Sequence, residues 1–150
     1  MEKMKIMLVD DEERFLKTTK KLIEKKGYNV LTALSGEAAL EKLKLQNVHV
    51  VMLDVKMPGM DGNQTLKAIK TLYPLVEVIM LTGHGTMDSA IDGLKSGAFD
   101  YLVKPADIDE ILEKVREAFE KRNFREEKIR MAQSKKYMRS PREILKGDDE

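Results

Sequence analysis

The sequence predicts an α/β fold in which a five-stranded parallel sheet is covered by helices on both faces. Short apolar runs alternate along the chain with longer segments whose apolar residues recur at helical spacing, which is typical of repeated β-α units. The runs are almost continuously apolar, as expected for strands that are covered on both sides. Because parallel strands are joined by right-handed crossovers, this order predicts an open, doubly wound sheet with its functional crevice outside the carboxyl ends of the strands.

The predicted strands are the apolar runs at residues 6–9, 28–33, 48–53, 76–81 and 99–103. A predicted helix follows each strand and is marked by one apolar stripe. In chain order the stripes consist of Phe15, Leu16, Thr19, Leu22 and Ile23; Ala39, Leu40 and Leu43; Leu66, Ile69 and Leu72; Ala90, Ile91 and Leu94; and Ile108, Ile111, Leu112, Val115 and Phe119. We expect Gly27 to end the first helix and Ser35 to cap the second at its N-terminus.

The composition is typical of a globular protein whose charges nearly cancel. Of its 150 residues 42% are hydrophobic and 35% charged, and 27 Lys and Arg against 26 Asp and Glu give a formal net charge of +1. This balance argues against a uniformly basic nucleic-acid binder and against an acidic disordered chain. Cysteine is absent, which excludes disulfides and thiolate metal sites. We expect a cytoplasmic protein, because neither a signal-peptide core nor a run of roughly 20 apolar residues is present.

A change of composition near residue 121 divides the chain into two expected parts. Residues 1–121 contain all the predicted strands and are expected to form one domain. Residues 122–150 are expected to form a basic helical extension, which continues the fifth helix to about residue 137 and then frays. Between residues 123 and 146 the chain has eight basic and three acidic residues, and this segment is too short for a second domain.

Charged and hydroxyl side chains follow four of the predicted strands, at the edge where such a sheet places its crevice. Asp10 and Asp11 follow the first strand, Asp54 the third, Thr82 the fourth and Lys104 the fifth. Carboxylates that lie close together repel one another unless a cation separates them, and Mg²⁺ is commonly held by carboxylate and phosphate oxygens. The pattern therefore predicts a Mg²⁺ site that can hold a phosphoryl group.

Simpler explanations exist for the same residues. Asp10 and Asp11 alone fit the N-cap of the first helix, Thr82 a strand-end hydroxyl and Tyr101 a half-buried core aromatic. A nucleotide or flavin site is disfavoured, because the acidic turn at residues 10–13 has no glycine whose amide would cradle a phosphate.

Four short motifs, in this order, resemble those of the receiver domain of two-component response regulators. They are Val-Asp-Asp-Glu at residues 9–12, Leu-Asp-Val-Lys-Met-Pro-Gly-Met-Asp-Gly at 53–62, Leu-Thr-Gly-His at 81–84 and Tyr-Leu-Val-Lys-Pro at 101–105. The resemblance extends from about residue 4 to about residue 121. It implies a flavodoxin-like strand order of 2-1-3-4-5 with helices on both faces, to which this chain adds an extended C-terminal helix.

The resemblance also implies the chemistry of the site. Asp54 is the implied nucleophile, which takes a phosphoryl group from the phosphohistidine of a histidine kinase. Asp10, Asp11, Asp54 and the backbone carbonyl of Lys56 are the implied Mg²⁺ ligands. Together with the ion, Lys104 would meet the negative charge of the phosphoryl group.

Thr82 and Tyr101 have the implied role of a switch. Thr82 would donate its hydroxyl to a phosphoryl oxygen, and Tyr101 would rotate into the space that the moving loop vacates. The chain would assist only its own phosphoryl transfer and dephosphorylation, so we do not expect an enzyme. The expected partners are a sensor histidine kinase or phosphotransfer protein and a downstream protein target, and a homodimer is also compatible. Neither direct DNA binding nor membrane insertion is expected.

Two alternative functions remain open. The stretch at residues 81–86 resembles receivers that precede enhancer-type transcription activators, so the chain also fits a fragment or derivative of a dimeric transcription regulator. An Mg²⁺-dependent phosphohydrolase shares the aspartate nucleophile. Haloacid-dehalogenase-like enzymes, however, have a second aspartate two residues after the nucleophile, where this chain has Lys56.

Overall fold

The structure, a computed structural model, describes residues 4–137 and confirms the predicted α/β fold. Five parallel strands form a sheet in the order β2-β1-β3-β4-β5, as the resemblance implied. The strands are β1 (Lys5–Val9), β2 (Asn29–Ala33), β3 (Val50–Asp54), β4 (Glu77–Thr82) and β5 (Asp100–Val103). Every residue of β3 and β4 is buried, whereas the edge strands β2 and β5 are partly exposed.

Two strands end one residue later than the apolar pattern predicts, at Asp54 and Thr82. Apolar residues stop at Leu53 and Leu81, but strand pairing continues, because Asp54 is the partner of Leu81 and Thr82 that of Val103. Both polar residues therefore belong to the sheet itself. Their backbones are positioned by the ladder rather than by a loop.

Five helices connect and flank the strands, as predicted. They are α1 (Glu13–Lys25), α2 (Gly36–Leu45), α3 (Gly62–Leu72), α4 (Met87–Lys95) and α5 (Ile108–Tyr137). A short 3-10 turn, η1 (His84–Thr86), precedes α4 and was not predicted. Ser35 caps α2 by accepting a hydrogen bond from the amide of Ala38 at 3.1 Å, and Gly27 follows α1 with a φ of 93°, both as expected.

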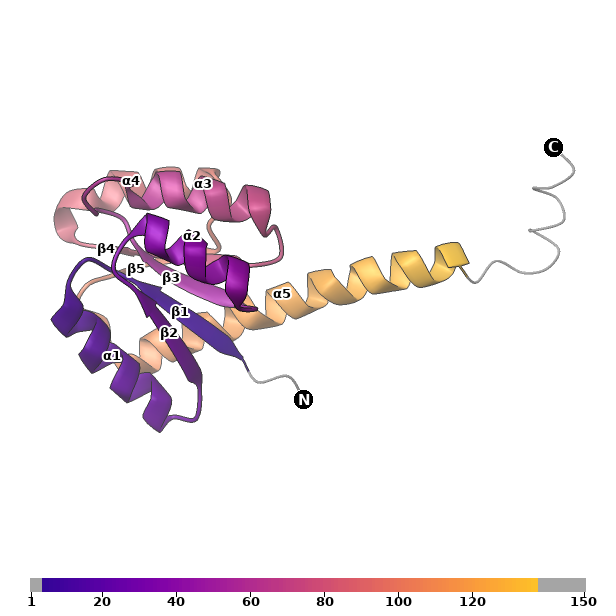
Figure 1. The fold of residues 1–150 in the computed structure, drawn as a ribbon, viewed down its shortest axis with the longest axis horizontal. Coiled ribbons are helices and arrows are strands. Elements are labelled where there is room, and N and C mark those ends of the chain that lie inside the picture. Colours follow the sequence, from indigo (N-terminus) through magenta and orange to yellow (C-terminus); the bar gives the residue numbers. More distant parts are fainter. Residues whose placement is uncertain (1–3, 138–150) are drawn as a thin grey trace, which may run out of the picture.

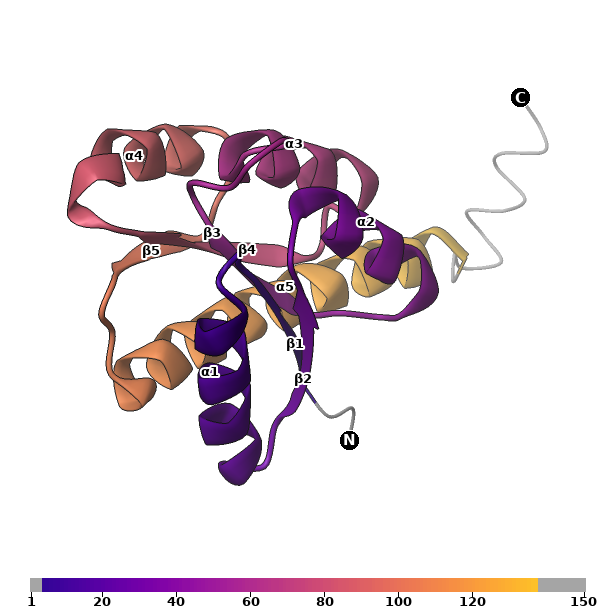
Figure 2. The ribbon, with the colours of Figure 1, turned by 60° about the vertical axis from the view of Figure 1, so that its left-hand side comes forward.

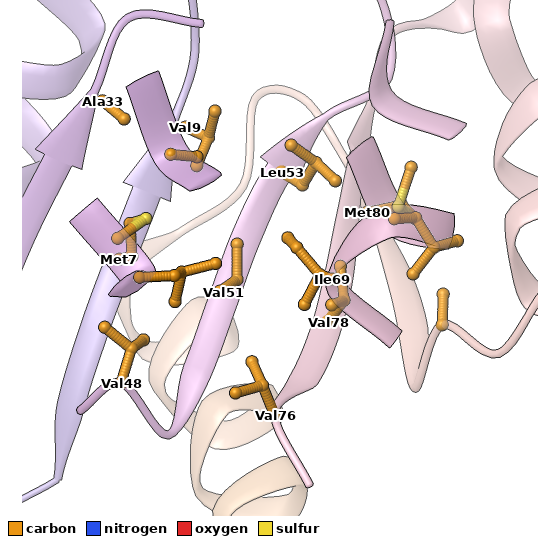
Figure 3. Packing of buried hydrophobic residues seen from close by; sticks show 14 of the residues in the cluster. Met7, Val9, Ala33, Val48, Val51, Leu53, Ile69, Val76, Val78 and Met80 are labelled. Atoms are coloured by element: carbon orange, nitrogen blue, oxygen red, sulfur yellow. The ribbon is translucent and has the colours of Figure 1, made fainter. Parts of the chain in front are cut away.

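The helices form a layer on each face of the sheet (Figures 1 and 2). Helices α1 and α5 lie on one face, and α2, α3 and α4 lie on the other. Figure 3 shows the core under the second layer, where Val51, Leu53 and Val78 of the central strands pack near Ile69 of α3. This burial on both faces explains why the central strands read as continuous apolar runs.

The core under α1 and α5 is a separate cluster. Leu16 and Ile23 of α1 and Val115 of α5 pack with Ile6 and Ile79 of the sheet. Some residues of the predicted stripes are less buried than expected: Leu22 is 43%, Leu72 59% and Ile91 41% exposed. They lie at the margins of their stripes, because successive helix positions are about 100° apart and only part of each stripe faces the sheet.

Helix α5 continues past the sheet as one helix to Tyr137, which agrees with the expected continuation to about residue 137 (Figure 1). The division into a domain at residues 1–121 and an extension at residues 122–150 stays a prediction. The predicted frayed end falls on residues 138–150, which lie outside the described residues. Within residues 4–137, no helix combines the length and the apolar character that crossing a bilayer requires.

Candidate functional site

Three carboxylates converge at the carboxyl edge of the sheet. Asp10 follows β1 directly, Asp11 comes next, and Asp54 is the last residue of β3. Each offers an oxygen to a group whose atoms all lie within 4.8 Å of one another. Asp10 is 1% and Asp54 9% exposed, whereas Asp11 is exposed to solvent. Neighbouring parallel strands bring these side chains together because their carboxyl ends meet at one edge.

Lys104 brings a positive charge to this cluster from the loop after β5. Its Nζ lies 2.5 Å from Oδ2 of Asp10 and 3.8 Å from Oδ1 of Asp54. The same ammonium lies 4.5 Å from the ring centroid of Phe15 in α1, a cation–π contact that flanks the site. The peptide bond between Lys104 and Pro105 is cis.

The surroundings of Asp54 shift the pKa of its carboxyl. Burial, followed by the negative charge of Asp10, raises its pKa from an ordinary 3.8 to about 6. The charge of Lys104 and a hydrogen bond from the backbone of Lys56 act in the opposite direction, and Asp11 adds a smaller upward shift in this pKa. The charge of Lys104 therefore does not fully offset the cost of ionising Asp54, and a further cation near this carboxylate would lower that cost.

The turn after β1 shows that Asp10 and Asp11 are not the N-cap of α1. Glu12 occupies the N-cap position, and its side chain makes no capping hydrogen bond. Asp10 instead accepts a hydrogen bond from the amide of Glu12 at 2.9 Å, through Oδ1, while its Oδ2 faces Lys104. Both carboxylate oxygens of Asp10 are thus engaged in shaping the site.

The loop after β3 is held close to Asp54. The amide of Gly62 donates to the carbonyl of Val55 at 2.9 Å, and a Cβ at Gly62 would stand only 2.5 Å from the carbonyl oxygen of Asp54. Asp61 then caps α3 and forms a capping box with Gln64. The exposed Lys56 is the second residue of this loop, and its amide is the backbone group that bonds to Asp54.

Thr82 lies in the site region, but its hydroxyl is engaged within its own loop. It is fully buried at the end of β4, and its backbone carbonyl accepts the amide of Lys104 at 2.8 Å. Its Oγ1 lies 3.0 Å from the carbonyl of Gly83 and 2.5 Å from Oγ1 of Thr86. Thr86 also accepts a hydrogen bond from the amide of Gly83 at 3.1 Å. Any movement of the Thr82 hydroxyl must therefore break contacts with this loop.

Tyr101, in β5, is half-buried and packs against the core under α2, α3 and α4. It is paired with Met80 of β4, two residues before Thr82. The structure thus places it on the strand next to Thr82, as expected, in a position that fits both a switch and a core aromatic.

The donor set fits a hard divalent cation. All three candidate side-chain ligands are carboxylates, the oxygen donors that Mg²⁺ prefers, and one lysine faces them. The remaining excess of negative charge is what a bound cation would neutralise. The nucleotide-binding alternative is disfavoured by the same excess, because it repels phosphate in the absence of a cation.

Two contributors to this region were not predicted from the sequence. Phe15 was assigned only to the apolar stripe of α1, and Thr86 was given no role. Thr86 lies four residues after Thr82 in a stretch with two glycines, which is a signal for a tight turn. For Phe15 no local signal exists, because its partner Lys104 is distant in the sequence.

Comparisons with known proteins agree with this geometry. A family model described as "Response regulator receiver domain" matches residues 6–116. The chain is 42% identical over 106 residues to the transcriptional regulatory protein ZraR of Escherichia coli K12, and 39% identical over 103 residues to the DNA-binding transcriptional regulator NtrC of Klebsiella pneumoniae. These alignments cover 71% and 69% of this chain but only 24% and 22% of those proteins. The chain therefore spans about a quarter of the length of these curated relatives.

Solved structures give the same result. A response regulator receiver domain protein from Clostridium thermocellum is similar with a TM-score of 0.77 and 37% identity, over 81% of this chain and 98% of that chain. NtrX from Brucella abortus is similar with a TM-score of 0.80 and 26% identity, over 87% of this chain and 30% of that chain.

Proposed function

The chain belongs to the response regulator receiver domain family, and from this premise we propose that Asp54 is its phosphoacceptor. Receiver domains are phosphoacceptor signalling modules of two-component systems, and the chain has this role. One observation supports the choice of Asp54 above all. It is a nearly buried carboxylate at the end of a central strand, 3.8 Å from the ammonium of Lys104 and clustered with Asp10 and Asp11.

We propose that Mg²⁺ is the cofactor. Receiver domains generally bind this ion at an acidic cluster, and here Asp10, Asp11 and Asp54 would hold it together with the backbone carbonyl of Lys56. When bound, the ion supplies positive charge to the carboxylates and to the phosphoryl oxygens. The residues themselves favour it, since Lys104 alone leaves the pKa of Asp54 raised.

The proposed reaction is transfer of a phosphoryl group from a phosphohistidine to Asp54. A carboxylate oxygen of Asp54 attacks the phosphorus in line with the phosphorus–nitrogen bond, so an oxygen–phosphorus bond forms as that bond breaks. The departing imidazole keeps the electron pair, and the product is an acyl phosphate on Asp54. Lys104 stabilises the charge on the phosphoryl oxygens, and Asp10 positions the lysine at 2.5 Å.

Thr82 and Tyr101 are the proposed switch. The Thr82 hydroxyl would leave Thr86 and donate to a phosphoryl oxygen, which would draw the loop after β4 towards the site. Tyr101 on the neighbouring strand would then turn into the vacated space. The two arrangements of one loop are the bistable element that the phosphoryl group biases.

The proposed partners are a sensor histidine kinase or phosphotransfer protein as donor and a downstream protein as target. Receiver domains interact with histidine kinases and output domains, and they are signalling domains rather than metabolic catalysts. We therefore propose a cytoplasmic signalling protein that is not an enzyme and assists only its own phosphoryl transfer and dephosphorylation. We do not propose that residues 4–137 bind DNA directly. The family match favours this function over a phosphohydrolase.

A second candidate is a receiver fragment or derivative of a dimeric transcription regulator. The curated relatives are named as transcriptional regulators, and α5 continues past the sheet as a helix. Light scattering with and without beryllofluoride distinguishes the candidates. A doubling of mass with beryllofluoride favours the dimeric regulator, and an unchanged monomer favours a diffusible binding module.

Intact-mass analysis after incubation with acetyl phosphate and Mg²⁺ tests the choice of Asp54. We expect wild-type protein to gain one phosphoryl group and Asp54→Asn to gain none. The matched control is Asp92→Asn, an exposed aspartate of α4, which should be labelled like the wild type. Phosphoryl uptake by Asp54→Asn, or uptake without added Mg²⁺ and in the presence of a chelator, would contradict the proposal.

A further inference from the structure

A second charged cluster lies at the amino-terminal edge of the sheet, opposite the site. Its centre is Glu77, the first residue of β4, whose side chain is 1% exposed. Three cationic side chains surround this carboxylate: Lys70 from α3, and Lys121 and Arg125 from α5. We call these four residues the Glu77 cluster.

Arg125 makes the shortest contact of the Glu77 cluster. Its Nη1 donates to Oε1 of Glu77 at 2.8 Å. Lys70 lies 3.8 Å from the same oxygen, and Lys121 lies 4.0 Å from Oε2. Hydrogen bonds at 2.9 Å to the carbonyls of Pro74 and Val76 hold the Lys70 ammonium on the domain side. The buried carboxylate thus joins one cation of the domain to two cations of α5.

Apolar burial holds only the first part of α5. Ile111, Leu112, Val115 and Ala118 are at most 4% exposed, but Phe124, Ile129 and Met131 are 62%, 47% and 53% exposed. An isolated helix turn is not stable by itself, and apolar packing on the domain is the usual source of helix stability. Lys121 and Arg125 lie where apolar packing ends. Their pairing with Glu77 therefore attaches the helix at that point, next to the buried side chain of Arg122.

Burial makes this attachment directional. A carboxylate that is removed from water needs positive charge and hydrogen-bond donors close by, so the side of α5 that carries Arg125 is required to face β4. Phe124 and Met131 are then left on the exposed surface of the helix. The ion pair therefore keeps the projecting part of α5 in the same rotation about its axis that the buried apolar residues set for the first part.

We propose that Glu77 is an anchoring site that fixes the projecting part of α5 to the receiver and sets the direction in which the helix leaves it. The anchored helix is a rigid arm for output contacts. Glu77 and Thr82 are the two ends of the same strand, so the anchor and the switch loop are joined by β4. This role goes beyond phosphoryl transfer at Asp54 and does not depend on it.

Hydrogen–deuterium exchange of the full chain tests the anchor. We expect Glu77→Gln to lower the protection of amides at residues 121–129 by roughly tenfold, between the effects of an exposed and a buried ion pair. The protection of β1 and β3 should fall no further than the global free energy of unfolding falls. Arg125→Gln should also lower this protection of residues 121–129, and the loss in the double variant should be smaller than the sum of the two single losses, because both changes remove the pair between Glu77 and Arg125.

Two matched controls separate the anchor from general charge effects on the helix. Glu127→Gln removes an exposed carboxylate of α5, and Arg130→Gln removes a cation whose partner is Glu126 in the same helix. Both should leave the protection of residues 121–125 unchanged. An equal loss of protection in either control, or wild-type protection in Arg125→Gln, would overturn the proposal. If Glu77→Gln does not fold, Arg125→Gln alone provides the test. Mg²⁺-dependent beryllofluoride binding should persist in Arg125→Gln whether or not the anchor exists, so it tests Asp54 separately.

Discussion

At the carboxyl edge of the sheet three carboxylates face one lysine, whereas at the amino-terminal edge one buried carboxylate faces three cations. Asp54 is left with a pKa raised to about 6, so its ionisation remains costly without a further cation. Glu77 obtains its positive charge from within the chain. The difference teaches that a local excess of negative charge marks a site that can bind a cation. A carboxylate surrounded by cations of the same chain instead forms a contact that stabilises the fold.

The largest expected effect comes from removing the lysine of the acidic site. Lys104→Met keeps the stem beside Phe15 but removes the ammonium, and we expect phosphoryl uptake from acetyl phosphate to slow by about 100- to 1000-fold, as for the loss of one preorganised electrostatic group. Intact-mass time courses with saturating Mg²⁺ measure the rate. Lys114→Met, which removes a lysine paired with Asp100 at 2.6 Å, should keep the wild-type rate. A Lys104→Met rate close to wild type would remove this lysine from the proposed mechanism.

At the opposite edge, Glu77→Gln should destabilise the fold. Three partly exposed cations would remain around a buried amide, and we expect the free energy of unfolding to fall by about 2 kcal/mol, between the effects of breaking an exposed and a buried ion pair. Urea denaturation measures the change. The exposed control Glu127→Gln should stay within about 0.5 kcal/mol of the wild type. A stable Glu77→Gln would show that the two edges do not differ in the way described.

In Mg²⁺-free buffer, Asp54→Asn should raise the free energy of unfolding, whereas Glu77→Gln should lower it. Because burial raises the pKa of Asp54 from 3.8 to about 6, the folded state binds its proton more tightly than the unfolded state does. The stability contributed by this group is complete below about pH 3.8 and is lost as the pH rises through 6. We therefore expect Asp54→Asn to be more stable than the wild type by about 2 kcal/mol at pH 7, with the advantage shrinking towards pH 4.

Urea denaturation of both proteins in a chelating buffer at several pH values measures this difference. The comparison is internal, since other titrating groups are shared by the two proteins. An advantage of Asp54→Asn that grows as the pH falls would contradict the raised pKa.

The smallest effect expected is the stabilisation of the wild type by Mg²⁺ itself. An ion that binds only the folded state adds about 1.4 kcal/mol at ten times its dissociation constant. Thermal denaturation at pH 7 should show this increment in the wild type and in Arg125→Gln, because the two edges of the sheet do not share side chains. Asp10→Asn should lose it, and a full increment in that variant would place the ion elsewhere.

Much of this architecture could be predicted from local pattern. Alternating apolar runs and helical stripes predicted the five strands and five helices, and the residues that follow those runs predicted which side chains meet at the carboxyl edge. The side chains at that edge follow from local pattern because all parallel strands end there. The errors are small and local: Asp54 and Thr82 belong to their strands, since backbone pairing does not stop where apolar character stops.

Other features of the site could not be predicted in this way. The 2.5 Å contact between Thr82 and Thr86 depends on how one short loop closes, and the short turn η1 has no clear apolar period of its own. The contact between the Lys104 ammonium and the ring of Phe15 depends on the position of α1 relative to β5. Such contacts are set by the packing of elements rather than by their formation.

The sequence by itself determined the order of elements, the edge at which chemistry gathers and the residue types that gather there, because these follow from side-chain periodicity and from the parallel direction of the strands. Only the tertiary structure decided which charges meet. Glu77 appears in the sequence as an interruption of the apolar run at residues 76–81, and nothing near it indicates that its partner is Arg125, 48 residues away. Ion pairing depends on distance and burial in space, and only the folded packing of α5 against β4 supplies both.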